Sequence, residues 1–178
     1  MTKDGRPSLI ANIRLFSGDR MSIRHLDKQE EAEAYGRRLA WFLNSQKFSL
    51  GAYPELYVLF TPSLAAGEIK LAEGPHEWWH RYVHVGLPGG VFEDLEAYSV
   101  VTKGIIDALI AVRPDQADTI RGADAVVGEH GSRLRFMIKR RETKNLVIEI
   151  TSSIEAWPRP SQHFISHTDK VTGYLPRG

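Results

Sequence analysis

The chain contains no cysteine among its 178 residues. Without cysteine it can form neither a disulfide framework nor a thiolate metal site, and it has no thiol nucleophile. It also lacks an excess of charge of one sign, because 23 Lys and Arg residues face 22 Asp and Glu residues for a net charge of +1. Binding to nucleic acid driven mainly by phosphate neutralisation is therefore not expected.

Long apolar runs are missing too. No stretch approaches the length of a membrane span, and the start Met1–Pro7 leads into no apolar run of the kind found in signal peptides. We therefore expect a cytoplasmic protein with no membrane partner. The hydrophobic content of 42% and the charged content of 25% are ordinary for globular proteins, and the length fits one domain, residues 1–178.

Only one segment matches a catalytic motif. His76-Glu77-Trp78-Trp79-His80 has the H-E-x-x-H spacing of zinc peptidases, in which two histidines on one helical turn bind zinc and the glutamate is the general base. Pro75 precedes the motif, and Tyr82-Val83-His84-Val85 after it favours a strand. We predict that residues 80–85 form a strand and that neither a metal nor another cofactor is bound. A small zinc-dependent hydrolase is the alternative function.

The stretch 94–154 has the clearest pattern in the chain. Asp94 is placed to cap a helix, and Val101, Ile105 and Leu109 recur at helical spacing until Pro114 ends it. This spacing predicts a long, largely buried helix.

A basic hairpin follows this helix. Leu134, Phe136 and Ile138 alternate with Arg133, Arg135, Met137 and Lys139, residues 141–144 can turn the chain, and residues 146–151 alternate again. We expect one face of the hairpin to pack on the core. The other face, with Arg133, Arg135 and Lys139, is either an ordinary solvated sheet face or a basic contact surface.

The remaining elements complete the expected fold. Strands are predicted at residues 8–16, 21–25, 56–60 and 82–85, and a shorter helix at 115–127. Asp27 and Glu30 form a capping-box pattern at the start of another helix. Residues 155–178 read as a largely irregular tail. Together these elements predict a single α+β domain with one mostly antiparallel sheet of about five to six strands and helices packed on one face.

Three segments give the chain a resemblance to the immunity proteins of bacterial polymorphic toxin systems. They are Trp78-Trp79-His80-Arg81-Tyr82, the helix from Glu93-Asp94-Leu95-Glu96 to Pro114, and the hairpin strand Val147-Ile148-Glu149-Ile150. The resemblance implies a compact cytoplasmic α+β protein without catalytic residues, which neutralises a cognate toxin by direct binding. The net charge of +1 departs from the acidic character of many such proteins, and this puts a basic nuclease toxin in doubt.

Candidate partner-binding residues follow from this interpretation. Trp78, Trp79 and Tyr82 are candidate anchors, because aromatic residues dominate interface hot spots. A place in the core is the equally weighted alternative for these three. Arg133, Arg135 and Lys139 are the candidate basic contacts, and the sequence leaves the oligomeric state open.

Overall fold

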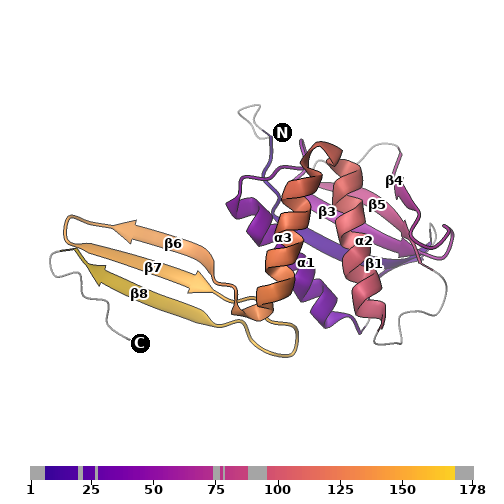
Figure 1. Ribbon diagram of the computed structural model, residues 1–178. Coiled ribbons are helices and arrows are strands. Elements are labelled where there is room, and N and C mark those ends of the chain that lie inside the picture. The colour runs from indigo at the N-terminus through magenta and orange to yellow at the C-terminus, as the bar shows by residue number, and fades with distance from the viewer. Residues whose placement is uncertain are drawn as a thin grey trace.

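The computed structural model describes residues 7–19, 22–26, 28–73, 77, 79–87 and 96–170. Its strands are β1 (Asn12–Asp19), β2 (Ser22–His25), β3 (Glu55–Thr61), β4 (Ile69–Leu71), β5 (His80–Gly86), β6 (Phe136–Glu142), β7 (Leu146–Ser152) and β8 (His163–Asp169). Its helices are α1 (Glu30–Ser45), α2 (Glu96–Val112) and α3 (Ala117–His130), with the 3-10 turns η2 (Pro114–Gln116) and η3 (Gly131–Arg133) on either side of α3. These elements form an α+β fold (Figure 1).

A five-stranded mixed sheet forms the body of the molecule, in the order β2-β1-β3-β5-β4. Its three central strands, β1, β3 and β5, run parallel, while β2 and β4 pair antiparallel at the edges. The prediction of one mostly antiparallel sheet is therefore wrong. Parallel neighbours need a connection that returns the chain along the sheet, and α1 makes that return before β3. The strand patterns predicted the strands without specifying which of them are neighbours.

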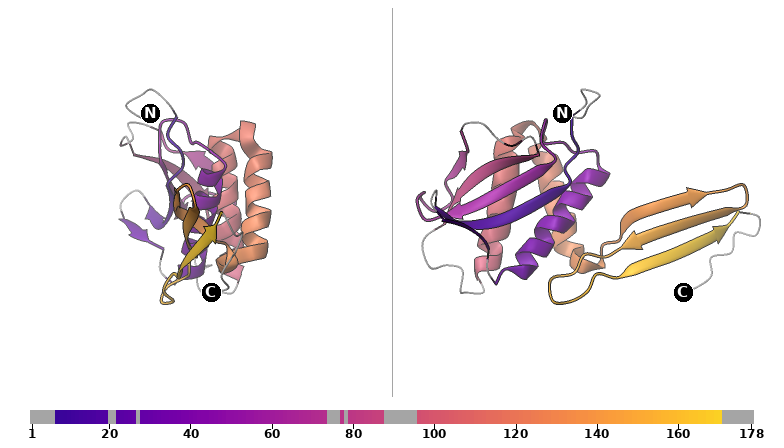
Figure 2. Two further views of the ribbon diagram at one scale, coloured as in Figure 1. Left: turned by 90° about the vertical axis from the view of Figure 1, so that its left-hand side faces the viewer. Right: turned by 180° about the vertical axis from the view of Figure 1, so that it is seen from behind.

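The helices cover one face of this sheet, as predicted. α1 packs on β1, α2 packs on β3 and β5, and α3 lies against α1 and α2. Seen from behind, none of the helices that the structure describes lies on the opposite face (Figure 2). Alternation along each strand sends the side chains of the hydrophobic core toward the helices, while Leu59 and His80, which are also buried, lie on the opposite face. The core between the two layers includes Ile13, Leu15, Leu39, Leu56, Val58, Phe60, Val83, Val85, Val101, Ile105 and Leu109.

The second sheet, of order β6-β7-β8, is antiparallel throughout and projects from the body (Figures 1 and 2). We call it the arm. The predicted hairpin is confirmed as β6 and β7, but the expectation that one of its faces packs on the core is wrong, because Phe136 is the only buried residue of β6. The prediction of an irregular tail is also wrong in part, because β8 pairs along the whole of β7. That pairing depends on the free edge of β7, which no local pattern within 163–169 reveals.

The base of the arm is fixed to α1. Arg38 is buried at 2% exposure, and its Nε donates a 2.8 Å hydrogen bond to the carbonyl of Ile154. Its Nη1 lies 2.8 Å from Glu31, which also accepts from Arg159 beyond β7 at 3.4 Å. The ring of Phe136 meets Trp41 of α1 edge-on, with 5.9 Å between the centroids.

Helix boundaries follow the sequence in two of three cases. α2 ends at Val112, before Pro114, and α3 covers most of the predicted 115–127 segment. Asp94 lies outside the described residues. α1 begins at Glu30 with Gln29 as its N-cap, so the capping box with Asp27 is wrong. Lys28 has a positive φ of 57°, in the left-handed region, so the helical backbone conformation does not extend back through this residue. Within the described ranges, no helix has both the length and the apolar character to cross a membrane.

Candidate functional site

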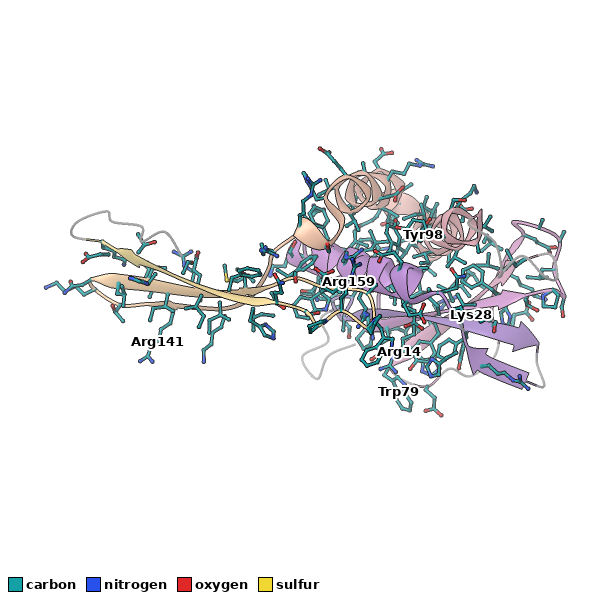
Figure 3. The ribbon with its side chains drawn as sticks, turned by 90° about the horizontal axis from the view of Figure 1, so that it is seen from below. Arg14, Lys28, Trp79, Tyr98, Arg141 and Arg159 are labelled. Carbon is teal, nitrogen blue, oxygen red and sulfur yellow. The ribbon has the colours of Figure 1, made fainter. Side chains whose placement is uncertain are left out.

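Aromatic, histidine and charged side chains occupy the face of the five-stranded sheet on which none of the described helices packs. The strand register places them in rows across the three parallel strands, because cross-strand partners share a face. The rows are Asn12, Glu55 and His80, then Arg14, Tyr57 and Tyr82, then Phe16, Leu59 and His84. Figure 3 shows Arg14 and Trp79 on this side, opposite the helices.

Tyr57 lies at the centre of this group. His80 stacks on its ring at 4.2 Å with an interplanar angle of 8°, and Tyr82 meets it edge-on at 5.3 Å. Phe16 lies at 5.1 Å, and the guanidinium of Arg14 lies over the ring at 5.7 Å. Burial raises the pKa of Tyr57, although Arg14 acts in the opposite direction. The phenol is therefore neutral at physiological pH and can donate a hydrogen bond.

Charge and exposure define the edge of the group. Arg14 forms an ion pair with Glu55 at 3.1 Å, so the two charges balance on the face. Trp79 is 36% exposed and meets His80 at 5.5 Å between ring centroids. Two of the three predicted aromatic anchors, Trp79 and Tyr82, thus lie on one face, and neither belongs to the core between sheet and helices. Trp78 lies outside the described residues.

The H-E-x-x-H segment does not continue as a helix at its second histidine. His80 is the first residue of β5, so the predicted strand at residues 80–85 is confirmed. In a strand, neighbouring side chains alternate between faces, and the helical turn that aligns two histidines is absent at this point. His76 lies outside the described residues. Among the residues that the structure describes, no group of three or more potential metal ligands gathers.

Two of the three candidate basic residues have intramolecular roles. Arg133 lies in η3, and its Nη2 donates a 2.8 Å hydrogen bond to the carbonyl of Glu129. This places a positive charge at the C-terminal end of α3, where it interacts favourably with the helix dipole. Arg135 precedes β6, and its guanidinium stacks 3.6 Å above the ring of Phe164. Lys139 is exposed on β6. These three residues therefore do not form the single strand face that the alternation predicted.

A groove of about 600 Å³, which sequence reasoning did not predict, lies between α1 and the base of the arm. It is lined by Ala11, Trp41, Phe42, Asn44, Ser45, Leu134, Arg135, Phe136 and Met137. Trp41 was the available signal, because a large aromatic residue lies off the core stripe that Tyr35 and Leu39 define on α1. Sequence reasoning also missed the exposed apolar side chains of the arm. Among them Met137 is 50% exposed and Ile165 74% exposed.

Comparison with family models, with curated proteins and with solved structures gave no match to this chain.

Proposed function

We propose that this chain is a non-enzymatic binding protein that holds a protein partner on the face of its body sheet opposite the helices. Following the resemblance in its sequence, the partner is a cognate bacterial toxin, and the chain acts as a cytoplasmic immunity protein. One observation carries the proposal: Trp79 and Tyr82 lie with Tyr57 and His80 in one aromatic group on a face without a helix.

The composition of this face suits protein recognition. Tyr and Trp provide large, rigid apolar surfaces with a polar tip, and they are enriched among the residues that dominate binding energy. The stacking of Tyr57 on His80 holds both rings in place before any partner arrives. A preformed surface of this kind loses little side-chain freedom on binding, which favours affinity.

Co-expression tests the proposal directly. The chain is produced in cells together with the toxin encoded beside its gene, and survival and co-purification are measured. We expect the wild-type chain to protect, and Trp79→Ala to weaken the complex by about 30-fold, as for an anchor worth about 2 kcal/mol. Trp157→Ala is the matched control, because Trp157 is 75% exposed and belongs to the loop after β7 rather than to the aromatic group.

Two results would contradict the proposal. The first is failure of the wild-type chain to protect against the neighbouring toxin. The second is equal binding by Trp79→Ala, Tyr82→Ala and the control, which would place the interface elsewhere on the molecule. Circular dichroism of each variant separates loss of binding from loss of folding.

A further inference from the structure

The two faces of the arm differ in how their charges are arranged. The register of β6, β7 and β8 places Lys139, Ile150 and Ile165 in one row, and Arg141, Ile148 and His167 in the next. Because cross-strand partners share a face, these six side chains lie together. We call this the strip face: an aliphatic strip of three isoleucines with a cation at each level along β6.

On the opposite face, charged side chains pair with one another within the chain. Arg140 forms ion pairs with Glu142 at 3.2 Å and with Glu149 at 3.6 Å, and Lys170 pairs with Glu142 at 2.5 Å. The lysine and Arg140 hold the pKa of the Glu142 carboxyl below its usual range. The phenyl ring of Phe164 lies under the guanidinium of Arg135. This face therefore offers a partner neither free charge nor an open ring.

The strip face differs from the opposite face in the pairing of its cations. Lys139 and Arg141 are exposed, and within the described part of the chain neither makes an ion pair or a side-chain hydrogen bond. Ile165, on the edge strand β8, is largely exposed. Asp169, opposite Leu146, is the only acidic residue that the strand register places on this face. Arg141 points away from the arm to the same side as Arg14 and Trp79 on the body (Figure 3).

We propose that the strip face continues the partner-binding side of the molecule and takes an acidic protein surface, one that presents carboxylates around apolar side chains. This inference rests on the proposed function and assigns the chemistry of the partner. Its apolar centre and charged margin are the anatomy of a protein interface. A three-stranded layer that exposes apolar residues on an unpacked face is also the kind of surface that a partner covers.

Charge and side-chain type favour an acidic protein over other occupants. Single-stranded nucleic acid is held by bases stacked on aromatic rings, whereas the centre of the strip face is aliphatic. A second copy of the chain in a two-fold arrangement would bring identical basic faces together, and like charges in contact oppose association. An acidic partner pairs with Lys139 and Arg141 and covers Ile148, Ile150 and Ile165.

Nuclear magnetic resonance titration of the full chain tests this assignment, because it detects weak binding residue by residue. The probe is a capped hexapeptide that alternates glutamate and leucine. Matched probes alternate lysine with leucine and glutamate with serine, and a thymidine decanucleotide tests nucleic acid. We expect the glutamate–leucine peptide alone to shift the amides of residues 139, 141, 148, 150 and 165, with affinity that falls as salt rises.

Charge reversal on the strip face is the second part of the experiment. The variant Lys139→Glu/Arg141→Glu should bind the glutamate–leucine peptide about tenfold more weakly or worse, as expected when an attractive pair becomes repulsive. The control Lys103→Glu/Arg121→Glu changes the net charge equally on exposed positions of α2 and α3, and should bind as the wild type does.

Several outcomes overturn the inference. They are shifts away from the strip face or none at all, stronger binding of the decanucleotide, equal binding by both charge-reversal variants, and concentration-dependent shifts of the strip face without a probe, which would indicate self-association. Each leaves the co-expression result intact. A toxin that depends on Trp79 but tolerates Lys139→Glu/Arg141→Glu would sustain the proposed function and reject this inference alone.

Discussion

At the scale of single residues, Gly104 sets how closely α2 approaches the body sheet. A Cβ at this position would lie 2.7 Å from Cε1 of Phe60 and 3.1 Å from Cγ1 of Val85. Both neighbours belong to the packed core, where there is little room to yield. The glycine is thus required by close packing, although it weakens the helix that contains it.

Substitution of Gly104 by alanine should therefore destabilise the protein by about 1–3 kcal/mol, the usual cost of overpacking a core. Gly122→Ala is the matched control in α3, because nothing lies within 4 Å of its Cβ position. It should stabilise the protein by about 0.5–1 kcal/mol through helix propensity. Urea unfolding measures both, and a stabilised Gly104→Ala variant would contradict the packing described above.

Tyr35 links α1 to α3, and its hydroxyl donates a 2.5 Å hydrogen bond to Asp124. Burial, followed by this hydrogen bond, raises the pKa of Tyr35 far above its ordinary value. An unfolded chain ionises this phenol near pH 10, whereas the folded chain keeps it protonated. The folded state then binds the extra proton, so the stabilisation that comes from Tyr35 is fully present below about pH 10 and falls as the pH rises further.

The measurement is the free energy of unfolding between pH 8 and pH 11. Tyr35→Phe should lower stability at pH 8 by about 1 kcal/mol and flatten the alkaline decline. A residual decline is expected, because burial also raises the pKa of Tyr57 and Tyr98. A variant that declines as steeply as the wild type would show that Tyr35 does not control the alkaline limb.

At the scale of elements, the join between α1 and the arm depends on a buried arginine. Arg38 satisfies the carbonyl of Ile154 and pairs with Glu31, although it stands in a helix among apolar neighbours such as Leu39. Its loss would leave the Ile154 carbonyl without this donor and would open a cavity at the base of the arm.

We therefore predict that Arg38→Ala destabilises the protein by about 2–4 kcal/mol, from the lost hydrogen bonds and packing. Arg37→Ala is the control, since the exposed Arg37 makes only a 3.5 Å contact with the carbonyl of Glu155. It should change stability by less than about 0.5 kcal/mol. Equal effects in thermal unfolding would mean that Arg38 does not fix the arm.

Several elements could be predicted from the sequence because their signals are local. The spacing of Val101, Ile105 and Leu109 predicts α2, and the alternation around Leu146–Ile150 predicts β7. Partners that lie far apart in the chain could not be predicted in this way. β8 depends on the edge of β7, and the parallel pairing of β1 with β3 depends on the path of α1.

The same distinction between local signals and distant partners holds for the candidate site. Trp79 and Tyr82 could be chosen as anchors from residue type, because exposed aromatic residues dominate interfaces. Their neighbours Tyr57 and Arg14 come from other strands and are brought to them only by the sheet register. Arg141 was missed because residues 141–144 were predicted as the turn, whereas β6 continues to Glu142. The β-bulge between Met137 and Lys139 shifts the register, so that Lys139 and Arg141 share a face with Ile150 and Ile148.

At the scale of the whole molecule, a two-layer body carries a single-layer arm. The body buries its apolar side chains between sheet and helices, whereas the arm strands bury only Phe136 and Ser152. Local opening costs less free energy where few apolar contacts must be broken.

Hydrogen exchange should therefore separate the two parts. The amides of the arm, for example Arg141 and Ile165, should exchange through local opening. Those of Val58 and Val83 in the body should exchange only with global unfolding. Mass spectrometry of exchange over time measures this difference, and equal protection in both sheets would show that the arm folds as one unit with the body.

The exposure of the arm also affects which amino-acid substitutions the protein can accept during evolution. Substitutions at exposed sites usually alter folding stability by less than about 0.5 kcal/mol, whereas changes in a packed core cost several times more. Residues such as Lys139, Arg141 and Ile165 can therefore vary with little penalty to the fold. A lineage that carries this architecture can acquire a new binding specificity through the arm while the body, and the stability that it provides, stay the same.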